Sequence, residues 1–244
     1  MAHETIDGIH RQTNLTYESH EYLSKREKVR QAEIELLRLR ERVADLRREL
    51  PPGAILQDYE FLEGPASLDD GDEPVRTVRL SDLFTGPGRS LVIYQFMFGK
   101  KNTSPCPMCT AWIDGLNGVA HHLAQNIDLA VVAAADPARL RELARKRGWH
   151  RLRLLSAGKN TFKYDLGGED REGNQDATIS VIARDADGTL RHFYSVHPRL
   201  ADDIAQRGID ECTPIWNVLD LTPQGRGEFS ASLDYGTKVH VTRG

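Results

Sequence analysis

Two cysteines, separated by two residues, stand where the sequence changes from an apolar run to a helical pattern. Cys106 and Cys109 enclose Pro107 and Met108 in the motif Cys-Pro-Met-Cys. The helix dipole and the free backbone N–H groups of a first helical turn favour the thiolate of the first cysteine. The chemistry indicated is thiol–disulfide exchange, in which Cys106 attacks as the nucleophile and Cys109 resolves the mixed disulfide.

The residues on either side of the motif predict the strand and the helix that this chemistry needs. The run 91–98 is apolar or aromatic apart from Gln95, as expected of a strand that is buried on both faces. Pro107 suits the first position of a helix, where its missing N–H is not needed. Beyond the motif, apolar residues recur at spacings of three and four: Trp112, Ile113, Leu116, Val119, Ala120 and Leu123.

The motif by itself allows other interpretations. It could be half of a zinc site, or a pair of inert thiols that happen to be neighbours. The third cysteine, Cys212, has no histidine at ligand spacing, which favours a redox dithiol and makes Cys212 a plain buried or loop thiol. Two thiolates with the Met108 thioether would also suit Cu(I). The competing function is therefore a non-catalytic scaffold, or a protein that binds a soft metal, copper or zinc.

Composition excludes several classes of protein. The chain has 244 residues, of which 39% are hydrophobic and 28% charged, enough for one large domain with an appendage. A net charge of −4 gives no overall attraction to nucleic acid or to an anionic membrane. The polar N-terminus is unlike a secretory signal, and no stretch approaches the roughly 18 apolar residues of a membrane span. With only three cysteines, a reducing, cytoplasmic setting is expected.

Three segments are expected along the chain: an N-terminal arm with a long amphipathic helix over 1–50, a compact domain over 51–227 and a C-terminal tail over 228–244. The helix is predicted from Tyr17 to Leu50, a stretch without Gly or Pro. Its apolar residues follow a 3.5-residue repeat that must be covered, which predicts a homodimer in which the helix packs on the partner or braces its own domain. This heptad stripe consists of Val29, Ala32, Leu36, Leu39, Val43, Leu46 and Leu50.

The order of elements predicts an α/β fold of thioredoxin-like architecture, a mixed sheet flanked by helices. The strands at 91–98 and 127–135 should be parallel neighbours, joined by a right-handed crossover through the cysteine-bearing helix. Cys106 then lies at the carboxyl end of the first strand, where the ligands of such sheets bind. Further elements are expected as strands at 55–61, 75–80 and 152–155, a helical turn at 81–84, a helix at 138–148 with Asp136 as its N-cap, and a hairpin of 178–183 with 190–196.

These residues resemble a known family. The segment YQFMFG (94–99), the Cys-Pro-x-Cys motif and the TAWIDGLNG that follows are similar to the bacterial "domain of unknown function 899" group, AhpC/TSA-like proteins of the thioredoxin fold. The resemblance runs from about residue 20 to 227, and it implies a thioredoxin-like fold and a thiol–disulfide activity, without a substrate. Further matches are the N-terminal helix ending in Leu-Pro, Leu80–Phe84, Gly148–Trp149, Phe162, Tyr164–Asp165 and Leu219–Arg226.

The chain departs from thioredoxin-type and peroxidase patterns at two places. Oxidoreductases of the thioredoxin type have a cis-proline before the strand that faces the dithiol, whereas this junction is Asp176-Ala177-Thr178. A non-proline cis bond costs roughly 3 kcal/mol, so we expect a trans peptide at Ala177 and weak activity on large protein disulfides. Thr103 stands three residues before Cys106, as in the peroxiredoxin-like P-x-x-x-[ST]-x-x-C, but Gly99 replaces its proline.

The expected substrate is a small thiol, disulfide or hydroperoxide, with an unidentified reductant. Lys100 and Lys101 are expected to help lower the pKa of Cys106. His192 or His197 could act as a general base and Asp114 as a proton shuttle, although structural or surface roles are favoured for all three. Residues expected to flank the substrate are Thr103, Pro105, Pro107, Trp112, Ala177 and Thr178.

Overall fold

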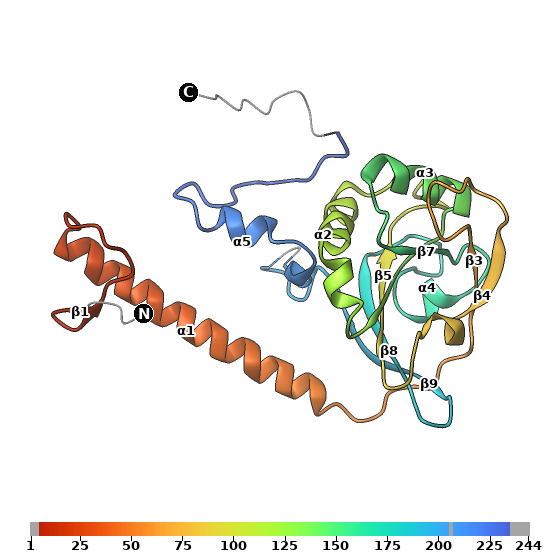
Figure 1. Cartoon of the computed structure of the whole chain (residues 1–244), viewed down its shortest axis with the longest axis horizontal. Coiled ribbons are helices and arrows are strands. Elements are labelled where there is room, and N and C mark those ends of the chain that lie inside the picture. The colour runs from red at the N-terminus through yellow and green to blue at the C-terminus, as the bar shows by residue number, and fades with distance from the viewer. Residues whose placement is uncertain (1–4, 205–206, 235–244) are drawn as a thin grey trace. The chain divides into compact units, whose positions relative to one another are not determined.

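A computed structural model describes residues 5–204 and 207–234 and divides the chain into two compact units, Met1–Pro51 and Pro52–Gly244. Figure 1 shows the elements of both units with their labels. Each unit is described by itself below.

The first unit consists of a small hairpin and one long helix, α1 (His20–Arg48). The predicted N-terminal arm contains a short antiparallel hairpin, formed by β1 (Thr5–Ile6) and β2 (Ile9–His10). Ser19 is the N-cap of α1, and its hydroxyl accepts a hydrogen bond from the Tyr22 N–H at 3.1 Å. The helix therefore begins three residues later than the sequence predicts.

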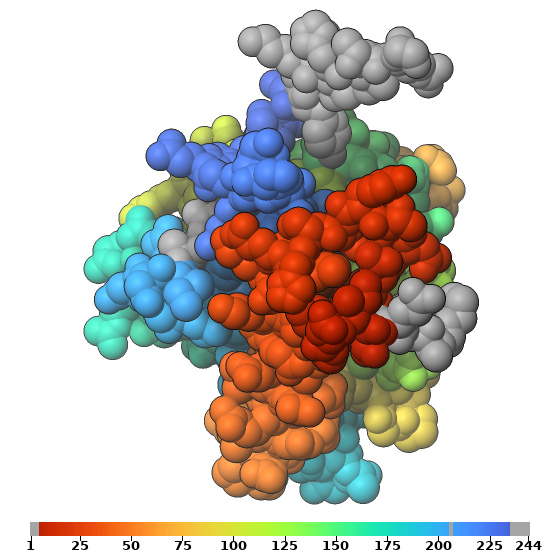
Figure 2. Space-filling model, turned by 90° about the vertical axis from the view of Figure 1, so that its left-hand side faces the viewer, coloured from red at the N-terminus to blue at the C-terminus, as the bar shows by residue number. Residues whose placement is uncertain are grey.

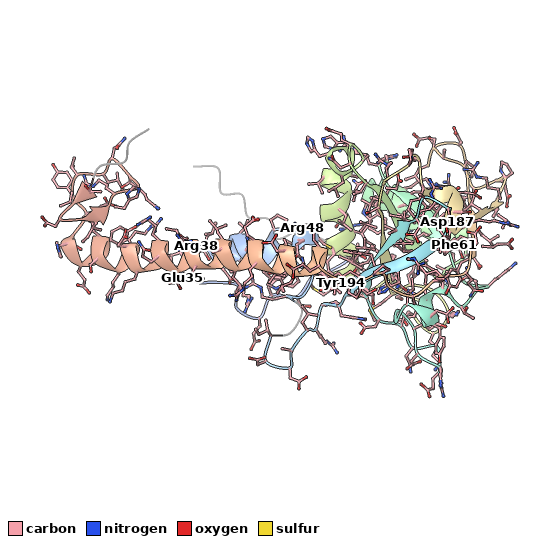
Figure 3. All side chains as sticks on the ribbon, turned by 90° about the horizontal axis from the view of Figure 1, so that it is seen from below. Glu35, Arg38, Arg48, Phe61, Asp187 and Tyr194 are labelled. Carbon is pink, nitrogen blue, oxygen red and sulfur yellow. The ribbon has the colours of Figure 1, made fainter. Side chains whose placement is uncertain are left out.

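The heptad stripe of α1 is exposed within this unit. Leu23 is the buried residue of α1. Along the stripe, Val29 is 51% exposed, Leu36 48% and Leu46 57%. Figure 2 shows the surface of α1 in red and orange, and Figure 3 shows Glu35 and Arg38 extending outward from the same helix. The unit consequently contains a long apolar stripe that its own residues do not cover.

A seven-stranded mixed sheet forms the second unit, in the order β4-β3-β7-β6-β5-β8-β9. The three central strands β7, β6 and β5 are parallel, and antiparallel strands extend the sheet on both sides. This confirms the predicted mixed sheet and the predicted parallel pairing of its two most apolar strands. The strands are β3 (Glu60–Glu63), β4 (Arg76–Arg79), β5 (Leu91–Phe96), β6 (Asp128–Ala133), β7 (Arg153–Ser156), β8 (Thr178–Arg184) and β9 (Leu190–Val196).

The helices of this unit are mostly those the sequence predicts. The crossovers between the parallel strands are α2 (Pro107–Leu123) and α3 (Pro137–Arg147). Asp136 occupies the N-cap position of α3, but its side chain makes no capping hydrogen bond. The 3₁₀ helix η1 (Leu80–Leu83) matches the expected turn, whereas α4 (Phe162–Asp165), η2 (Asp210–Cys212) and α5 (Ile215–Leu219) had no predicted counterpart.

One predicted strand was displaced. The strand expected at 55–61 begins only at Glu60, because the preceding residues run along the other edge of the sheet. There the Leu56 N–H donates to the Leu190 carbonyl at 2.9 Å, and Ile55 bridges to Arg191. Ile55 is 66% exposed, so its apolar side chain does not mark a core position.

Two hydrophobic cores cover the two faces of the sheet. Tyr94 and Phe96 of β5 pack with α2 and α3 on one face. Ile93 of the same strand packs on the other face with Phe162 of α4 and with η1. Alternation along one strand thus places α2 and α4 on opposite sides of the sheet. Within the described residues, no helix is long and apolar enough to cross a bilayer.

Candidate active site

The backbone of Met97, the first residue after β5, holds both cysteines of the motif. Its carbonyl accepts a hydrogen bond from the Cys106 N–H at 3.2 Å. Its N–H faces the Cys109 sulfur and, after the Tyr94 hydroxyl, favours the Cys109 thiolate. Figure 1 shows α2 beside the strand β5 that ends next to Met97. The carboxyl end of the central strand therefore fixes the start of α2.

Cys106 is the N-cap of α2, and its side chain is half-buried. Its sulfur accepts a hydrogen bond from the Cys109 N–H at 3.4 Å. The pKa of Cys106 is lowered from an ordinary 9.0 to about 6. The main cause is the Cys109 thiol, and the backbone N–H groups of Cys109 and Met108 add to its effect. Burial opposes them, because it disfavours the charged form. Cys106 is therefore a thiolate at neutral pH.

Cys109 is fully buried, one helical turn into α2. Burial is the main cause that raises its pKa well above the ordinary value, and the negative charge of Cys106 adds to it. The thiol form of Cys109 is accordingly the donor that stabilises the Cys106 thiolate. One thiolate next to one protonated thiol is the arrangement that a nucleophile and a resolving cysteine require.

Tyr94 extends from β5 into the same buried region. The side chain is 0% exposed, and its hydroxyl faces the Cys109 sulfur without a hydrogen bond of normal geometry to any described residue. Burial raises the pKa of Tyr94, and a thiolate at Cys109 would raise it further. A thiolate at Cys212 would have a smaller effect in the same direction. A neutral Tyr94 hydroxyl thus lies in the electrostatic field of the buried thiol.

Lys163, in α4 on the opposite face of the sheet, is 1% exposed. Its ammonium donates to the carbonyl oxygen of Phe96, the last residue of β5, at 3.2 Å. Burial lowers the pKa of Lys163 from 10.5 to about 8. Among the effects that raise this pKa, that of a thiolate at Cys109 is the largest. A buried cation therefore lies close behind the dithiol.

The residues that the sequence analysis places around the substrate fall into two groups. Pro105 is half-buried and Pro107 and Thr103 are exposed, so these three flank Cys106 at the surface. The Thr103 carbonyl accepts a hydrogen bond from Arg139 at 2.6 Å. The other three are buried: Trp112, Ala177 and Thr178 are 2%, 1% and 0% exposed. Trp112 packs on Trp216, at 5.9 Å between ring centroids, which makes it a core residue.

The Asp176-Ala177-Thr178 junction lies beside Cys106 and has the expected trans geometry. Among the described residues, the cis peptide bond is Glu73–Pro74. The Ala177 N–H donates to its neighbour's carboxylate, Asp176 Oδ1, at 2.8 Å, and Asp176 raises the pKa of Cys106. Thr178 Oγ1 lies 3.1 Å from His197 Nδ1. The backbone edge that would face a substrate is thus already bonded within the chain.

Other sequence-based assignments change in the structure. Lys100 and Lys101 were expected to help lower the pKa of Cys106, but they are not among its main causes. Lys100 pairs with Glu169 at 2.6 Å, and Lys101 contacts Asn174. Asp114 is engaged structurally, because it accepts hydrogen bonds from Arg147 and from Trp149 Nε1, the latter at 2.7 Å.

His192 and Cys212 also have structural roles. His192 contacts Ser195 at 2.8 Å on β9. Cys212 in η2 is 3% exposed, as expected of a plain buried thiol, and burial raises its pKa to about 12.

Two pockets lie near the start of α2. One, of about 220 Å³, adjoins the loop before Cys106 and is lined by Phe98, Thr103, Ser104, Pro105, Arg139, Glu142, Leu143 and Lys146. A larger one, of about 620 Å³, lies between α2 and the segment 229–234, and neither motif cysteine lines it. Neither motif cysteine lines the smaller pocket either, but its wall includes Pro105, the residue before Cys106.

Sequence reasoning missed Tyr94, Lys163 and the charge of Asp176. Tyr94 was visible only as one more aromatic residue in an apolar strand. Lys163 lies between Phe162 and Tyr164, and no pattern distinguishes it from a surface lysine. Only the pairing of distant segments reveals that these side chains surround the dithiol.

A family model described as "Bacterial protein of unknown function (DUF899)" matches residues 11–240. The chain belongs to this family. Among curated proteins, none matches the sequence.

Three solved structures are similar to this member of the family. Reduced Prx3 of Vibrio vulnificus, in complex with hydrogen peroxide, is 16% identical, covers 66% of this chain and 96% of its own, and has a TM-score of 0.46. Peroxidoxin BcpB of Mycobacterium tuberculosis is 16% identical over 67% and 94% of the two chains, with a TM-score of 0.44. AhpC of the same organism is 17% identical over 66% and 88%, with a TM-score of 0.45. Identities this low transfer no activity to the present protein.

The low pKa of Cys106 predicts its reactivity. Alkylation of Cys106 by iodoacetamide, traced by mass spectrometry, should rise with pH around a midpoint near 6. In Cys109→Ala the largest stabilising donor is lost, so the midpoint should move up while the backbone N–H groups keep it below 9. A midpoint that is unchanged in Cys109→Ala would contradict the assignment of that donor.

The buried ammonium of Lys163 predicts a pH-dependent stability. Its folded-state pKa of about 8 lies below the ordinary 10.5, so at pH 7 burial of the charge destabilises the fold by about 3 kcal/mol, a cost that disappears as pH rises from 8 to 10.5. Lys163→Met should therefore be more stable than wild type in urea at pH 7, and the difference should shrink towards pH 10. The exposed control Lys159→Met should show no such change. A constant difference between wild type and Lys163→Met would refute this cost.

Proposed function

We propose that this protein is a thiol–disulfide oxidoreductase that acts on a small disulfide or hydroperoxide. Cys106 is the nucleophile and Cys109 the resolving thiol. The observation that carries the proposal is the pairing of two thiols with opposite pKa shifts across the first turn of α2. Such splitting prepares one thiolate for attack and keeps the second protonated until a mixed disulfide has formed.

With a disulfide, the Cys106 thiolate attacks one sulfur, and the other sulfur leaves as a thiolate. Cys109 then loses its proton and attacks Cys106, which forms the intramolecular disulfide and releases the second thiolate. With a hydroperoxide, Cys106 becomes a sulfenic acid and an alcohol leaves; condensation with Cys109 then releases water. An external thiol reductant must supply two electrons to restore the dithiol.

The surroundings of Cys106 favour a small substrate. An extended polypeptide would need free backbone groups at the junction before β8, but the Ala177 N–H is bonded to Asp176. The 220 Å³ pocket beside Pro105 has room for the non-reacting part of a small molecule. Its walls carry charges of both signs, since Lys146 pairs with Glu142 at 2.6 Å and Arg139 donates to the Thr103 carbonyl. The scarcity of cysteines is consistent with a reducing, cytoplasmic setting.

The competing soft-metal function has less support. Met108 would supply the third soft ligand, but its sulfur accepts a hydrogen bond from the Ala231 N–H at 3.2 Å. Within the described residues, no group of three or more His, Cys, Asp or Glu side chains is placed to hold a metal. Stoichiometric copper or zinc in reduced protein, lost in Cys106→Ser, would support the metal-binding function instead.

The dithiol proposal predicts how single cysteine variants behave. Oxidation of wild type should consume two thiols per chain, traced to Cys106 and Cys109, while Cys212 stays reduced. Wild type should reduce a small-molecule disulfide and hydrogen peroxide faster than insulin. Cys106→Ser should abolish turnover, and Cys109→Ser should accumulate a mixed disulfide or sulfenic acid. If wild type reduces no oxidant faster than the double serine variant, the catalytic function is refuted.

We further propose that α1 mediates a homodimer. The stripe is half exposed over three heptads, and a second copy of the same stripe would bury it. Burial of a leucine is worth about 1.5–3 kcal/mol, so several such residues on each copy offset the cost of association.

The exposed stripe gives this proposal a matched pair of variants. Leu36 and Leu37 are adjacent leucines with similar exposure, 48% and 58%, but only Leu36 lies on the stripe. Leu36→Lys should lower the mass in solution, measured by light scattering, from that of a dimer toward that of a monomer, whereas Leu37→Lys should not. Wild type that is monomeric at all accessible concentrations would disprove the dimer.

A further inference from the structure

We propose that Lys163 is a positioning residue for the second step of this reaction: acting through the peptide bond between Phe96 and Met97, its ammonium stabilises the thiolate of Cys109. The inference rests on the proposed function, because it assigns a role within the resolving step. Lys163 touches neither cysteine and lies on the opposite face of the sheet from α2.

The first observation is the isolation of the Lys163 charge. The side chain is almost completely buried, and its hydrogen bond goes to the Phe96 carbonyl. Across residues 5–204 and 207–234, the ion pairs that form do not include Lys163; the nearby Glu169 is bound by Lys100. A buried ammonium without a carboxylate partner is costly, so its field acts on whichever anion can form nearby.

The second observation is the peptide unit that separates Lys163 from Cys109. A trans peptide is planar, and its carbonyl and N–H point in opposite directions. The Phe96 carbonyl accepts from Lys163 at 3.2 Å, and the N–H of the same peptide, on Met97, is after the Tyr94 hydroxyl the next group that favours the Cys109 thiolate. A cation at the oxygen polarises the amide and makes its N–H a stronger donor, as in other hydrogen-bond chains.

The charges around Lys163 single out Cys109. Glu169 and Asp176 also favour the ammonium, and Lys100 opposes it, but a thiolate at Cys109 would have the largest effect of these neighbours. The coupling is reciprocal, so the ammonium must favour the Cys109 thiolate by the same free energy. It therefore offsets part of the burial that holds the Cys109 proton.

The charge of Lys163 affects the reaction only in the resolving step. In the reduced protein Cys106 carries the charge and Cys109 keeps its proton. Once Cys106 is in a mixed disulfide, its negative charge is gone, and Cys109 must release a proton to water before its sulfur can attack. Lys163 then supplies the positive charge that stabilises the new thiolate.

Dipyridyl disulfide separates the two steps. Attack by Cys106 releases one pyridinethione and leaves a pyridyl mixed disulfide; attack by Cys109 on Cys106 releases the second. In Lys163→Met and Lys163→Gln the second release should slow at pH 7, and the first should stay within about twofold. Each unit by which the pKa of Cys109 rises should slow the second release roughly threefold, because a tenfold loss of thiolate is partly offset by the higher nucleophilicity of the thiolate that remains.

Matched controls separate charge from packing. Lys163→Gln retains a donor for the Phe96 carbonyl, so equal slowing in both variants assigns the effect to the charge. Lys100→Met removes the neighbouring exposed lysine and should not slow the second release. If wild type releases only one pyridinethione, the proposed function fails; if it releases two and the Lys163 variants match it, the role of Lys163 fails.

Oxidised wild-type protein gives a test without substitution. With both motif thiols in a disulfide, neither can titrate, and the Met97 amide resonance should shift as Lys163 loses its proton. Because Cys109 then carries no charge, the pKa of Lys163 should lie at or below about 8. The shift should disappear in Lys163→Met. A Met97 amide that is unaffected in this range would overturn the proposed coupling through the peptide.

Discussion

The site depends on the backbone of one residue, Met97, just beyond the central strand. Its carbonyl holds the Cys106 N–H and its N–H faces the Cys109 sulfur, so the end of β5 determines where α2 begins. The loop that connects them must turn sharply. Gly99, with a φ of 99°, passes so close to Ala135 that a Cβ there would lie 2.1 Å from its backbone nitrogen. These contacts fix the positions of β5, the loop and α2 relative to one another.

Burial then makes two identical thiols chemically different. Cys106 lies at the half-exposed start of the helix, where N–H groups and the neighbouring thiol stabilise its charge. Cys109 lies one turn deeper, where desolvation disfavours the same charge. Three residues of separation are enough, because one helical turn leads from the protein surface into a dry core. Tyr94 and Lys163 act on the buried partner, and Asp176 on the exposed one.

The junction before β8 restricts what this thiol pair can bind. A trans peptide at Ala177, bonded through its N–H to Asp176, leaves less free backbone for an extended polypeptide than a cis-proline would. The adjacent pocket offers a different kind of recognition, by side chains that include Arg139. Under the proposed function, this bonding disfavours an extended polypeptide and favours a small substrate.

The amino-acid sequence by itself determined most of the elements and the place of Cys106 at the start of a helix. Period-two and period-3.6 patterns depend on local geometry, so β5, α2, the parallel pairing of β5 with β6 and the position of Cys106 at a helix start could all be predicted. The trans peptide at Ala177 followed from the cost of the alternative. The displaced strand near Ile55 shows the limit, since an apolar residue can lie on an exposed edge.

Only the tertiary structure decided which side chains act on the thiols. Lys163 is 54 positions beyond Cys109 in the chain, and its charge becomes relevant because α4 packs behind the end of β5. Lys100, much nearer in sequence, pairs instead with Glu169. Electrostatic influence depends on distance in space and on exclusion of water, and neither quantity is a property of sequence spacing.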